Sequence, residues 1–339
     1  MNHKMRVRNM KQKILKILKQ NPSSFVSGQK ISEQFGVTRA AVWKSIKQLQ
    51  AAGYEIESET KNGYKLISCP DLLTSSEVMP YLKKSCFPYQ IIHFNQLDST
   101  NNKAKELAEH REPEGTVVIA EQQTQGKGKV GKKWISAPYK GIYMSIILRP
   151  ELDFSGSSLL SLLGCVAVGK ALLSFGCSVQ FKWPNDVYVN EKKLCGILTE
   201  GSGEIDQLDY LILGIGINVN QTRQDFSKSL SSKASSLKIE LGYRVSRQKL
   251  TAAILSEFEI QYHQLKQNGS AKEALDFYKN HSNIIGEKVL LQRNKQQTVE
   301  AKVLDIDQFG QLTVQYHDGS IVAISSGEIT VQNTSPNFT

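Results

Sequence analysis

The sequence predicts an α+β protein of several domains, with a helical module at the N-terminus, a central α+β domain and a small C-terminal β-domain. Three observations predict it. The 339 residues suffice for two or three domains of roughly 150 residues each. Residues 1–66 hold 13 Lys and Arg against 4 Glu, whereas the remainder holds 29 Lys and Arg against 28 acidic residues. After residue 76, short β-rich runs are interspersed with a few helices, which favours a mixed, largely antiparallel sheet.

The uneven charge indicates a basic module that binds a polyanion, joined to a nearly neutral body. Of the net charge of +10, +9 lies in residues 1–66. The composition is ordinary for a globular protein, which excludes collagen-like, disordered and disulfide-scaffold classes. No segment reaches the roughly 18 apolar residues of a membrane span, and the N-terminus lacks the apolar core of a signal peptide. We therefore expect no membrane partner.

Cysteine and histidine usage gives no sign of disulfides or of a structural metal. The five cysteines form no C-x-x-C pair, and the six histidines show no metal-ligand spacing. We therefore expect reduced thiols in a cytoplasmic protein.

Residues 1–67 predict three short helices. The second spans residues 28–35 behind a Ser27 cap, and Gly36 then turns the chain because it tolerates a positive φ. Thr38 caps the third helix. Two helices joined by a glycine turn form a helix-turn-helix, and residues 37–44 (Val-Thr-Arg-Ala-Ala-Val-Trp-Lys) resemble the winged helix-turn-helix of bacterial repressors.

A wing and a basic helix face complete this N-terminal module. Asn62-Gly63 between two β-runs predicts a type I′ hairpin. We expect Trp43 at the edge of the core rather than in a groove of DNA. The alternative is a small helical domain with a solvated basic face. The predicted DNA-contacting residues are Gly28, Gln29, Thr38, Arg39, Ala40, Lys44, Ser45 and Lys47.

Residues 68–76 predict a linker, which is followed by a central domain over 77–283 and a C-terminal domain over 284–335. The first motif of the central domain is residues 98–102, Asp-Ser-Thr-Asn-Asn, between a strand and a helix. Its hydroxyls and amides cap the helix or bind a polar ligand there. Taken alone, this motif favours capping.

The second motif is a loop rich in glycine and lysine, residues 123–134 (Gln-Thr-Gln-Gly-Lys-Gly-Lys-Val-Gly-Lys-Lys-Trp). Its glycines allow a ligand to approach the backbone, and its four lysines suit phosphate or carboxylate. It lacks the order and context of a P-loop. A flexible solvated loop is the alternative.

The third motif is residues 182–198, which begin Lys-Trp-Pro-Asn-Asp and continue through Lys-Leu-Cys-Gly-Ile. Lys193 begins a strongly apolar strand, where a lysine is costly unless it meets an anion. A fourth piece, Gly214-Ile215-Gly216, places glycines inside a strand and predicts a ligand or a second backbone against it.

Together these motifs resemble those of biotin–protein ligases, which carry G-R-G-R-x-G-R-x-W and then K-W-P-N-D followed by K-L-x-G-I. With the N-terminal module, nearly the whole chain resembles the bifunctional biotin–protein ligases that also repress the biotin operon. Residues 285–331, with turns at Phe309-Gly310 and Asp318-Gly319, look like four short strands of that family's SH3-like barrel.

The resemblance implies that biotin and ATP form biotinyl-5′-adenylate, which is then attacked by a lysine of a biotin carboxyl carrier domain. Catalytic roles would fall to Lys193, Lys129 and Asp186, with Asp186 holding Mg²⁺ or orienting the amine. Biotin would be held by Ser99, Thr100, Asn101, Gln123, Gly126, Lys127, Gly128, Lys129 and Lys193. The nucleotide would be held by Lys129, Lys132, Trp134, Asn185 and Asn218. The adenylate would also favour a homodimer that binds operator DNA.

The sequence departs from the family at three positions of the loop. Lys127, Lys129 and Lys132 stand where the family usually has arginines, and lysine lacks their planar bidentate grip. We therefore hypothesise that this loop retains the adenylate less tightly.

Two other functions fit the same motifs: a ligand-responsive DNA-binding regulator with weak catalysis, and a lipoate-type ligase. Lys193 and Asp186 argue against the first, and the loop and the N-terminal module argue against the second.

Overall fold

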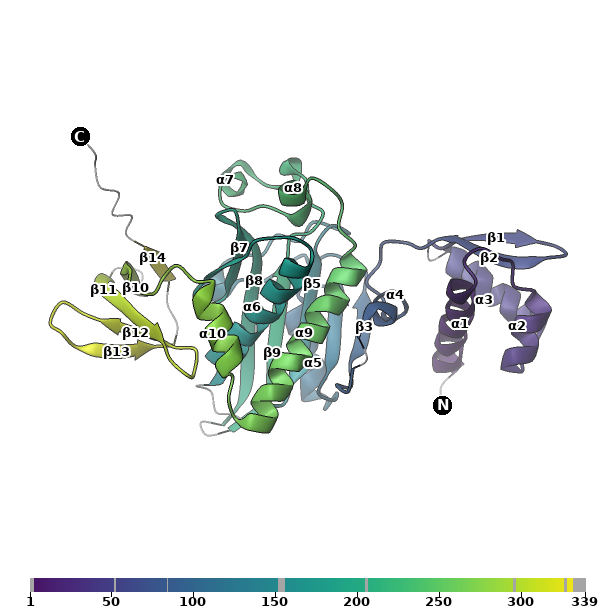
Figure 1. Ribbon diagram of the computed structural model, residues 1–339. Helices are drawn as coiled ribbons and strands as arrows, with labels where there is room; N and C mark the ends of the chain where they lie inside the picture. The colour runs from purple at the N-terminus through teal and green to yellow at the C-terminus, as the bar shows by residue number, and fades with distance from the viewer. Residues whose placement is uncertain are drawn as a thin grey trace. The chain divides into compact units, whose positions relative to one another are not determined.

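The computed structural model describes residues 3–51, 53–83, 85–151, 156–204, 207–294, 297–325 and 328–331 (Figure 1). The chain forms two compact units, Met1–Leu72 and Leu73–Thr339. This boundary falls inside the predicted linker, and Leu73 is already buried in the core of the second unit.

The first unit is a helix-turn-helix with a two-stranded wing. Its elements are α1 (His3–Gln20), α2 (Gly28–Phe35), α3 (Arg39–Ala51), β1 (Glu55–Glu59) and β2 (Gly63–Ser68). Ile14, Leu18, Ile31, Val42 and Ile46 meet in its buried core, so each helix contributes one apolar face.

The predicted caps of this unit are confirmed. Ser27 Oγ accepts a hydrogen bond from Lys30 N, and Thr38 Oγ1 accepts one from Ala41 N. Gly36 adopts a left-handed φ of 62° at the end of α2. Local chemistry therefore determines where α2 ends and α3 begins.

The hairpin forms, but its predicted turn type is wrong. Glu59 pairs with Gly63, so residues 60–62 make a three-residue turn, and Gly63 has a φ of 106° while Asn62 has no positive φ. A type I′ turn needs positive φ at two successive residues. The Asn62 amide instead donates to the Glu59 carboxylate.

The second unit is built on a seven-stranded sheet of order β3-β4-β5-β9-β8-β7-β6. Among the described strands of this sheet, only β3 and β4 pair in parallel, so the sheet is mixed and largely antiparallel, as predicted. The strands are β3 (Gln90–Phe94), β4 (Thr116–Ala120), β5 (Ile142–Leu148), β6 (Gln180–Lys182), β7 (Asp186–Val189), β8 (Lys192–Glu204) and β9 (Gln207–Ile217).

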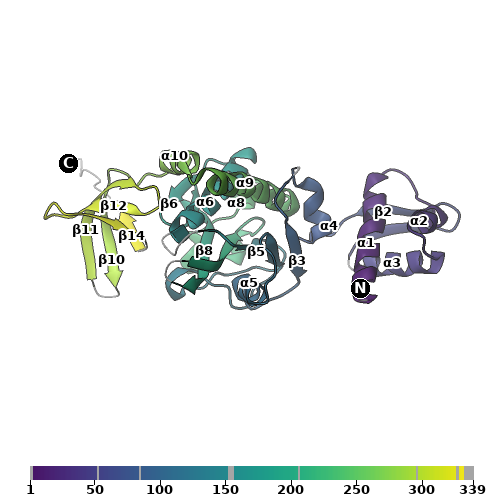
Figure 2. The same cartoon turned by 90° about the horizontal axis from the view of Figure 1, so that it is seen from below.

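Helices cover both faces of this sheet. Figure 2 shows α5 on one face, and α6, α9 and α10 on the other. The helices are α4 (Ser75–Val78), α5 (Thr100–Glu109), α6 (Ser157–Ser174), α7 (Lys228–Ser231), α8 (Leu237–Leu241), α9 (Arg247–Asn268) and α10 (Lys272–Asn280). Short 3-10 turns lie at Met79–Tyr81, Lys129–Gly131 and Arg223–Asp225.

Helix α6 is the central core helix. Its mean hydropathy of 1.6 and its 18 residues are compatible with a membrane span, but 72% of the segment is buried inside the fold. The helix is therefore part of the core of this unit.

The C-terminal part forms a five-stranded sheet rather than the four strands predicted. Its order is β13-β12-β11-β10-β14. The strands are β10 (Lys288–Asn294), β11 (Gln297–Ile306), β12 (Leu312–Gln315), β13 (Ile321–Ile324) and β14 (Glu328–Val331). It joins the central sheet where Trp183 Nε1 donates to Gly310 O at 3.0 Å.

Candidate functional site

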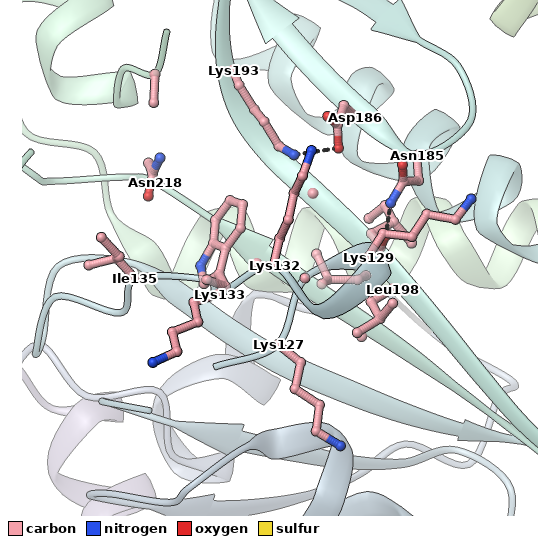
Figure 3. Close-up of a pocket in the computed structure, with 18 of the residues that line it drawn as sticks. Lys127, Lys129, Lys132, Lys133, Ile135, Asn185, Asp186, Lys193, Leu198 and Asn218 are labelled. Atoms are coloured by element: carbon pink, nitrogen blue, oxygen red, sulfur yellow. Dashed lines mark hydrogen bonds and ion pairs between the residues drawn. The ribbon is translucent and has the colours of Figure 1, made fainter. Parts of the chain in front are cut away.

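A cavity of about 470 Å³ opens beside the central sheet, between the lysine-rich loop, β7–β8 and residues 225–234 (Figure 3). It brings together most of the predicted ligand-binding residues, which lie far apart in the sequence. Those that line it are Ser99, Thr100, Asn101, Gln123, Lys127, Gly128, Lys129, Lys132, Trp134, Asn185, Asp186, Lys193 and Asn218. Gly126 does not line it among the described residues.

Glycines of β8 and β9 form the floor of the cavity. Gly196 pairs with Gly216, and both face the Trp134 ring, where a Cβ at Gly216 would lie 2.7 Å from the indole. A Cβ at Gly214 would overlap the Asn101 side chain. The sequence predicted a ligand or a backbone against these glycines, but the groups that lie there are two side chains.

Lys193 meets the anion that its place in an apolar strand requires. Its Nζ lies 2.6 Å from Asp186 Oδ1. The two residues stand on the neighbouring strands β7 and β8, where Asp186 pairs with Gly196 and Lys193 with Tyr188. The same ammonium lies 5.7 Å from the centre of the Trp134 ring. Hydrogen bonds from Lys193 N to Lys233 O and from Ser235 N to Lys193 O hold its backbone. A positive charge is therefore held at a defined place in the cavity.

An uncharged hydrogen-bonding group lies at the start of α5. Gln123 Oε1 accepts from Thr100 N at 2.8 Å and from Thr100 Oγ1 at 3.1 Å, while Gln123 Nε2 donates to Ser136 Oγ. Ser145 Oγ lies 2.8 Å from Thr100 Oγ1 and 2.6 Å from Asn101 Oδ1. These groups suit a polar, neutral ligand.

Two side chains of the 98–102 motif behave differently from expectation. Ser99 precedes α5 and is buried, but its hydroxyl makes no capping hydrogen bond. The amide of Asn101 is engaged by the protein, since its Nδ2 donates to Glu200 Oε2 at 2.7 Å and to Leu198 O at 3.3 Å. Glu200 is a residue that the sequence reasoning missed.

The lysine-rich loop closes on itself as a short hairpin. Trp134 N donates to Gly126 O at 2.9 Å, and Gly128 N to Lys132 O at 2.6 Å. In Figure 3, Lys132 extends toward Asp186, whereas Lys127 and Lys133 point away from it. Burial lowers the pKa of Lys129, and the nearby Asp186 carboxylate opposes that shift.

The amides predicted for the nucleotide are both held within the protein, Asn185 by backbone and Asn218 by a side chain. Asn185 Nδ2 donates to Ile197 O, and Ile197 N donates back to Asn185 O at 2.8 Å. Asn218 is buried, and its Oδ1 accepts from Gln221 Nε2 at 3.1 Å.

Residues 225–234 also line the cavity, and the sequence reasoning missed them because they carry no motif. Asp225 anchors this segment, since its carboxylate accepts from Thr222 N and from Lys140 Nζ, the latter at 2.6 Å. The sequence carried one local signal for this segment, because Asp225 follows Thr222 at the spacing of a helix capping box.

Comparison with known proteins agrees with this geometry. Residues 93–218 match the Biotin/lipoate A/B protein ligase family, residues 11–65 an HTH domain, and residues 284–331 the Biotin protein ligase C terminal domain. The Bifunctional ligase/repressor BirA of Bacillus subtilis (strain 168) is 37% identical over 321 residues, which is 94% of this chain and 98% of that protein. This chain belongs to the bifunctional ligase/repressor family.

Relatives at greater distance agree. The ligase/repressor of Escherichia coli (strain K12) is 28% identical over 91% of this chain and 94% of its own length. The solved biotin protein ligase from Aquifex aeolicus, in complex with biotin and ATP, superposes with a TM-score of 0.61 at 30% identity, over 73% of this chain and 99% of that one.

In this ligase/repressor, the outer face of α3 carries the side chains suited to DNA. Arg39, Lys44 and Lys47 are exposed there. Gln29, Thr38 and Ala40 are also exposed, and Gly28 is half-buried against the Tyr64 ring.

Two predictions for α3 are wrong. Trp43 is 55% exposed rather than at the core edge, and the Lys47 ammonium lies 5.9 Å from its ring centre. Ser45 is buried, and its Oγ donates to Ala41 O. Both errors have the same cause. Consecutive positions of an α-helix lie about 100° apart around its axis, so an error of one position moves a side chain between the buried and the exposed side.

Proposed function

We propose that this ligase/repressor activates biotin with ATP and transfers the biotinyl group to a lysine of a biotin carboxyl carrier domain. The observation that carries the proposal is the pairing of Lys193 with Asp186 in the same cavity as the neutral cluster of Thr100 and Gln123. The cavity thus offers the paired Lys193, the further lysines of the loop, and a separate set of uncharged donors and acceptors.

The first step would form the adenylate. Neutral hydrogen bonds from Ser99, Thr100, Asn101 and Gln123 suit the ureido ring, which is polar but uncharged. A carboxylate oxygen of biotin attacks the α-phosphorus of ATP, and the bond from that phosphorus to the bridging oxygen breaks as pyrophosphate leaves. The Lys193 ammonium would stabilise the negative charge on both reactants.

The nucleotide would lie against the loop and the glycine floor. Lys129 and Lys132 would face phosphates, together with Asn185 and Asn218, while Trp134 would pack on the base. Lys127, Gly126 and Gly128 would let the loop close over biotin.

Mg²⁺ would be held mainly by the phosphates. Among the described residues, no three acidic, His or Cys side chains gather as a metal site, and Mg²⁺ commonly takes one or two carboxylates plus substrate phosphates. Asp186 would supply the carboxylate, and the ion would supply neutralising charge.

The second step would transfer the biotinyl group. The neutral amine of the carrier lysine attacks the acyl carbon, and the carbon–oxygen bond to phosphate breaks as AMP leaves. Asp186 would orient the incoming amine, and Lys193 would stabilise the departing phosphate.

One assay tests the ligase proposal against both alternatives. The chain is incubated with ATP and a biotin carboxyl carrier domain, with biotin in one arm and lipoate in the other, and the mass of the carrier is measured. We expect one biotinyl group on one lysine. Lipoylation alone would favour a lipoate-type ligase, and no modification in either arm would favour the regulator.

We further propose that the first unit binds operator DNA as part of an adenylate-dependent homodimer. Arg39, Lys44, Lys47 and Trp43 would meet the groove, with Gly28, Gln29, Thr38 and Ala40 at its rim. Analytical centrifugation with and without biotin plus ATP tests dimerisation, and a monomer under both conditions would contradict it.

The DNA surface has its own matched test. Lys44→Ala should weaken operator binding and reduce the slope of log K against log salt by about one. Ser45→Ala, beside it but buried, should leave the slope unchanged. Equal effects of the two variants would contradict this assignment.

We also propose that residues 284–335 act as an SH3-like module packed on the catalytic part at 77–283. The contact from Trp183 to Gly310 supports this, since Trp183 also lines the cavity. A cytoplasmic location stays a prediction.

A further inference from the structure

The lysine-rich loop is anchored at both ends by one buried arginine. The loop runs from residue 122 to residue 140, between Glu121 at the end of β4 and Gly141 before β5. Arg247 Nη1 lies 2.7 Å from Glu121 Oε2 and 3.0 Å from Gly141 O. A single guanidinium nitrogen thus joins the two ends of the segment that carries Gln123, Lys129 and Trp134.

Glu121, the carboxylate that Arg247 holds, has further partners in other parts of the unit. The second oxygen of Glu121 accepts from His93 Nε2 of β3 at 2.8 Å and from Leu73 N at 2.9 Å. Tyr139 N donates to Glu121 O at 3.1 Å, which closes the loop a second time. The loop base is therefore tied to β3, to α9 and to the first residue of the unit.

Burying the charges of Arg247 and Glu121 costs free energy, and the stability of the fold does not by itself require a charged pair at this place. The side chains of Arg247 and Glu121 are both fully buried. Replacing a buried ion pair by well-packed apolar residues often leaves the stability of a protein unchanged or increases it. What apolar residues do not provide is directional hydrogen bonding to a carboxylate and a carbonyl at once.

We propose that Arg247 is a positioning residue for the reaction: it holds the two ends of loop 122–140 so that Gln123, Lys129 and Trp134 reach the ligand together. Arg247 itself lines no part of the cavity. The proposal rests on the proposed ligase function for its kinetic consequences, but the ordering of the loop does not depend on that function.

The decisive variants separate positioning from stability. Arg247→Met alone leaves the Glu121 carboxylate buried without its cation, so it is expected to lower the melting temperature strongly. The double variant Glu121→Gln, Arg247→Met removes both charges, while the new glutamine oxygen can still accept from Leu73 N. It should melt near the parent temperature and still lack the clamp, that is, the contacts by which Arg247 joins Glu121 to Gly141 at the two ends of the loop.

Two readouts are measured on the double variant. Adenylate dissociation should become about tenfold to a hundredfold faster, since small displacements of positioned groups have effects of that size. Trypsin should cleave the unliganded loop at Lys127, Lys129, Lys132 and Lys133 at least about tenfold faster, because cleavage follows local opening. Arg247→Lys keeps the charge on a shorter side chain without the guanidinium, so it should leave both rates between those of the parent and those of the double variant.

Arg149 supplies the matched control. Its guanidinium donates to the carbonyls of Asp209, Ala108 and Glu112, away from the loop. Arg149→Met should lower stability without changing loop cleavage or adenylate dissociation. An equal effect of Arg149→Met would overturn the proposal.

A folded double variant with parental cleavage and dissociation rates would also overturn the proposal. If the double variant does not fold, Arg247→Lys decides, and parental cleavage in that variant together with parental dissociation overturns it. If the parent protein makes no adenylate, the ligase proposal fails by itself, and the cleavage rates still test the clamp.

Discussion

Two ion pairs flank the same loop, and they differ in their exposure to water. Lys193 and Asp186 lie 2.6 Å apart with 31% and 19% of their side chains exposed, and both line the cavity. Arg247 and Glu121 lie 2.7 Å apart with no exposure at all. Their distances are nearly equal, so distance does not distinguish their roles.

Exposure determines what each pair can do. A cation at the edge of a cavity can exchange its carboxylate for a ligand, because water and ligand both reach it. A sealed pair has no such exchange, and breaking it by removing one partner costs about 3–5 kcal/mol. The open pair, Lys193 and Asp186, is therefore suited to contact ligands during the reaction. The sealed pair, Arg247 and Glu121, is suited to position the groups that make those contacts.

The largest effect expected on the open pair comes from Lys193→Ala. Ligation should fall by about a hundredfold to a thousandfold, because a preorganised cation is lost where charge develops. The melting temperature should barely change, since partly exposed pairs contribute about 1 kcal/mol or less. Lys103→Ala, which breaks the exposed pair with Glu106, is the control. Retained ligation would show that the open pair has no chemical role.

The sealed pair should contribute to the stability of the folded protein, and acid should remove that contribution. Burial opposes ionisation of Glu121, but the hydrogen bond from His93, the charge of Arg247 and the N–H of Leu73 outweigh it and hold its pKa below the ordinary 4.5. A depressed folded pKa stabilises the protein above the unfolded value, and that contribution is lost as pH falls through the folded one.

Thermal melting from neutral pH to about pH 3.5 measures this contribution. The double variant Glu121→Gln, Arg247→Met should lose less stability on acidification than the parent does. Parallel curves would show that other carboxylates dominate acid unfolding.

Glu200 should give an intermediate effect because it is partly buried. Burial opposes its ionisation, but hydrogen bonds from Lys105 and Asn101 hold its pKa below the usual value. Its Oε1 lies 2.7 Å from Lys105 Nζ and 3.8 Å from Lys127 Nζ of the loop. Glu200→Gln keeps an acceptor for Asn101 but removes the charge that attracts Lys127.

We expect Glu200→Gln to raise the KM for biotin by about threefold to tenfold with little change in kcat. Steady-state ligation measures both constants. Glu106→Gln, on the exposed surface, should change neither. A fall in kcat alone would place Glu200 in the chemistry instead.

The smallest effect is expected from Lys129→Arg. A planar, bidentate cation should slow adenylate release by about twofold to fivefold. Because burial lowers the pKa of Lys129, the parent should also lose adenylate faster at alkaline pH, and the arginine should remove that dependence. Dissociation rates between about pH 7 and about pH 10 measure this.

The control for Lys129→Arg is Lys133→Arg, because position 133 is not one of the family's arginine positions. An unchanged or faster release in Lys129→Arg would sink the hypothesis that lysines loosen this loop.

Local features were predictable because their causes are local. Ser27, Gly36 and Thr38 act on backbone within three or four residues, and the structure has all three as expected. That Lys193 would have an anionic partner was predictable, since a lysine in an apolar strand is costly without one. The turn at residue 63 was not, because register across the hairpin determined its length.

Single positions on α3 were less predictable. Trp43 and Ser45 are close in the sequence, yet the structure exposes the first and buries the second. Both positions lie near the boundary of the apolar face, where the tilt of α3 against α1 and α2 determines which side chain is covered. That tilt depends on packing between helices.

The sequence by itself determined the elements, the basic face of the first unit and the motifs that surround one ligand. Capping, glycine conformation and apolar periodicity act over a few residues, so the chain specifies them directly. Only the tertiary structure decided which distant groups meet. Glu121 and Arg247 are 126 positions apart, and no local pattern connects them. Their contact exists because the packing of α9 against α6, the helix that lies on β8 and β9, carries a buried guanidinium to the base of the loop. Low solvent access makes its directional hydrogen bonds strong there.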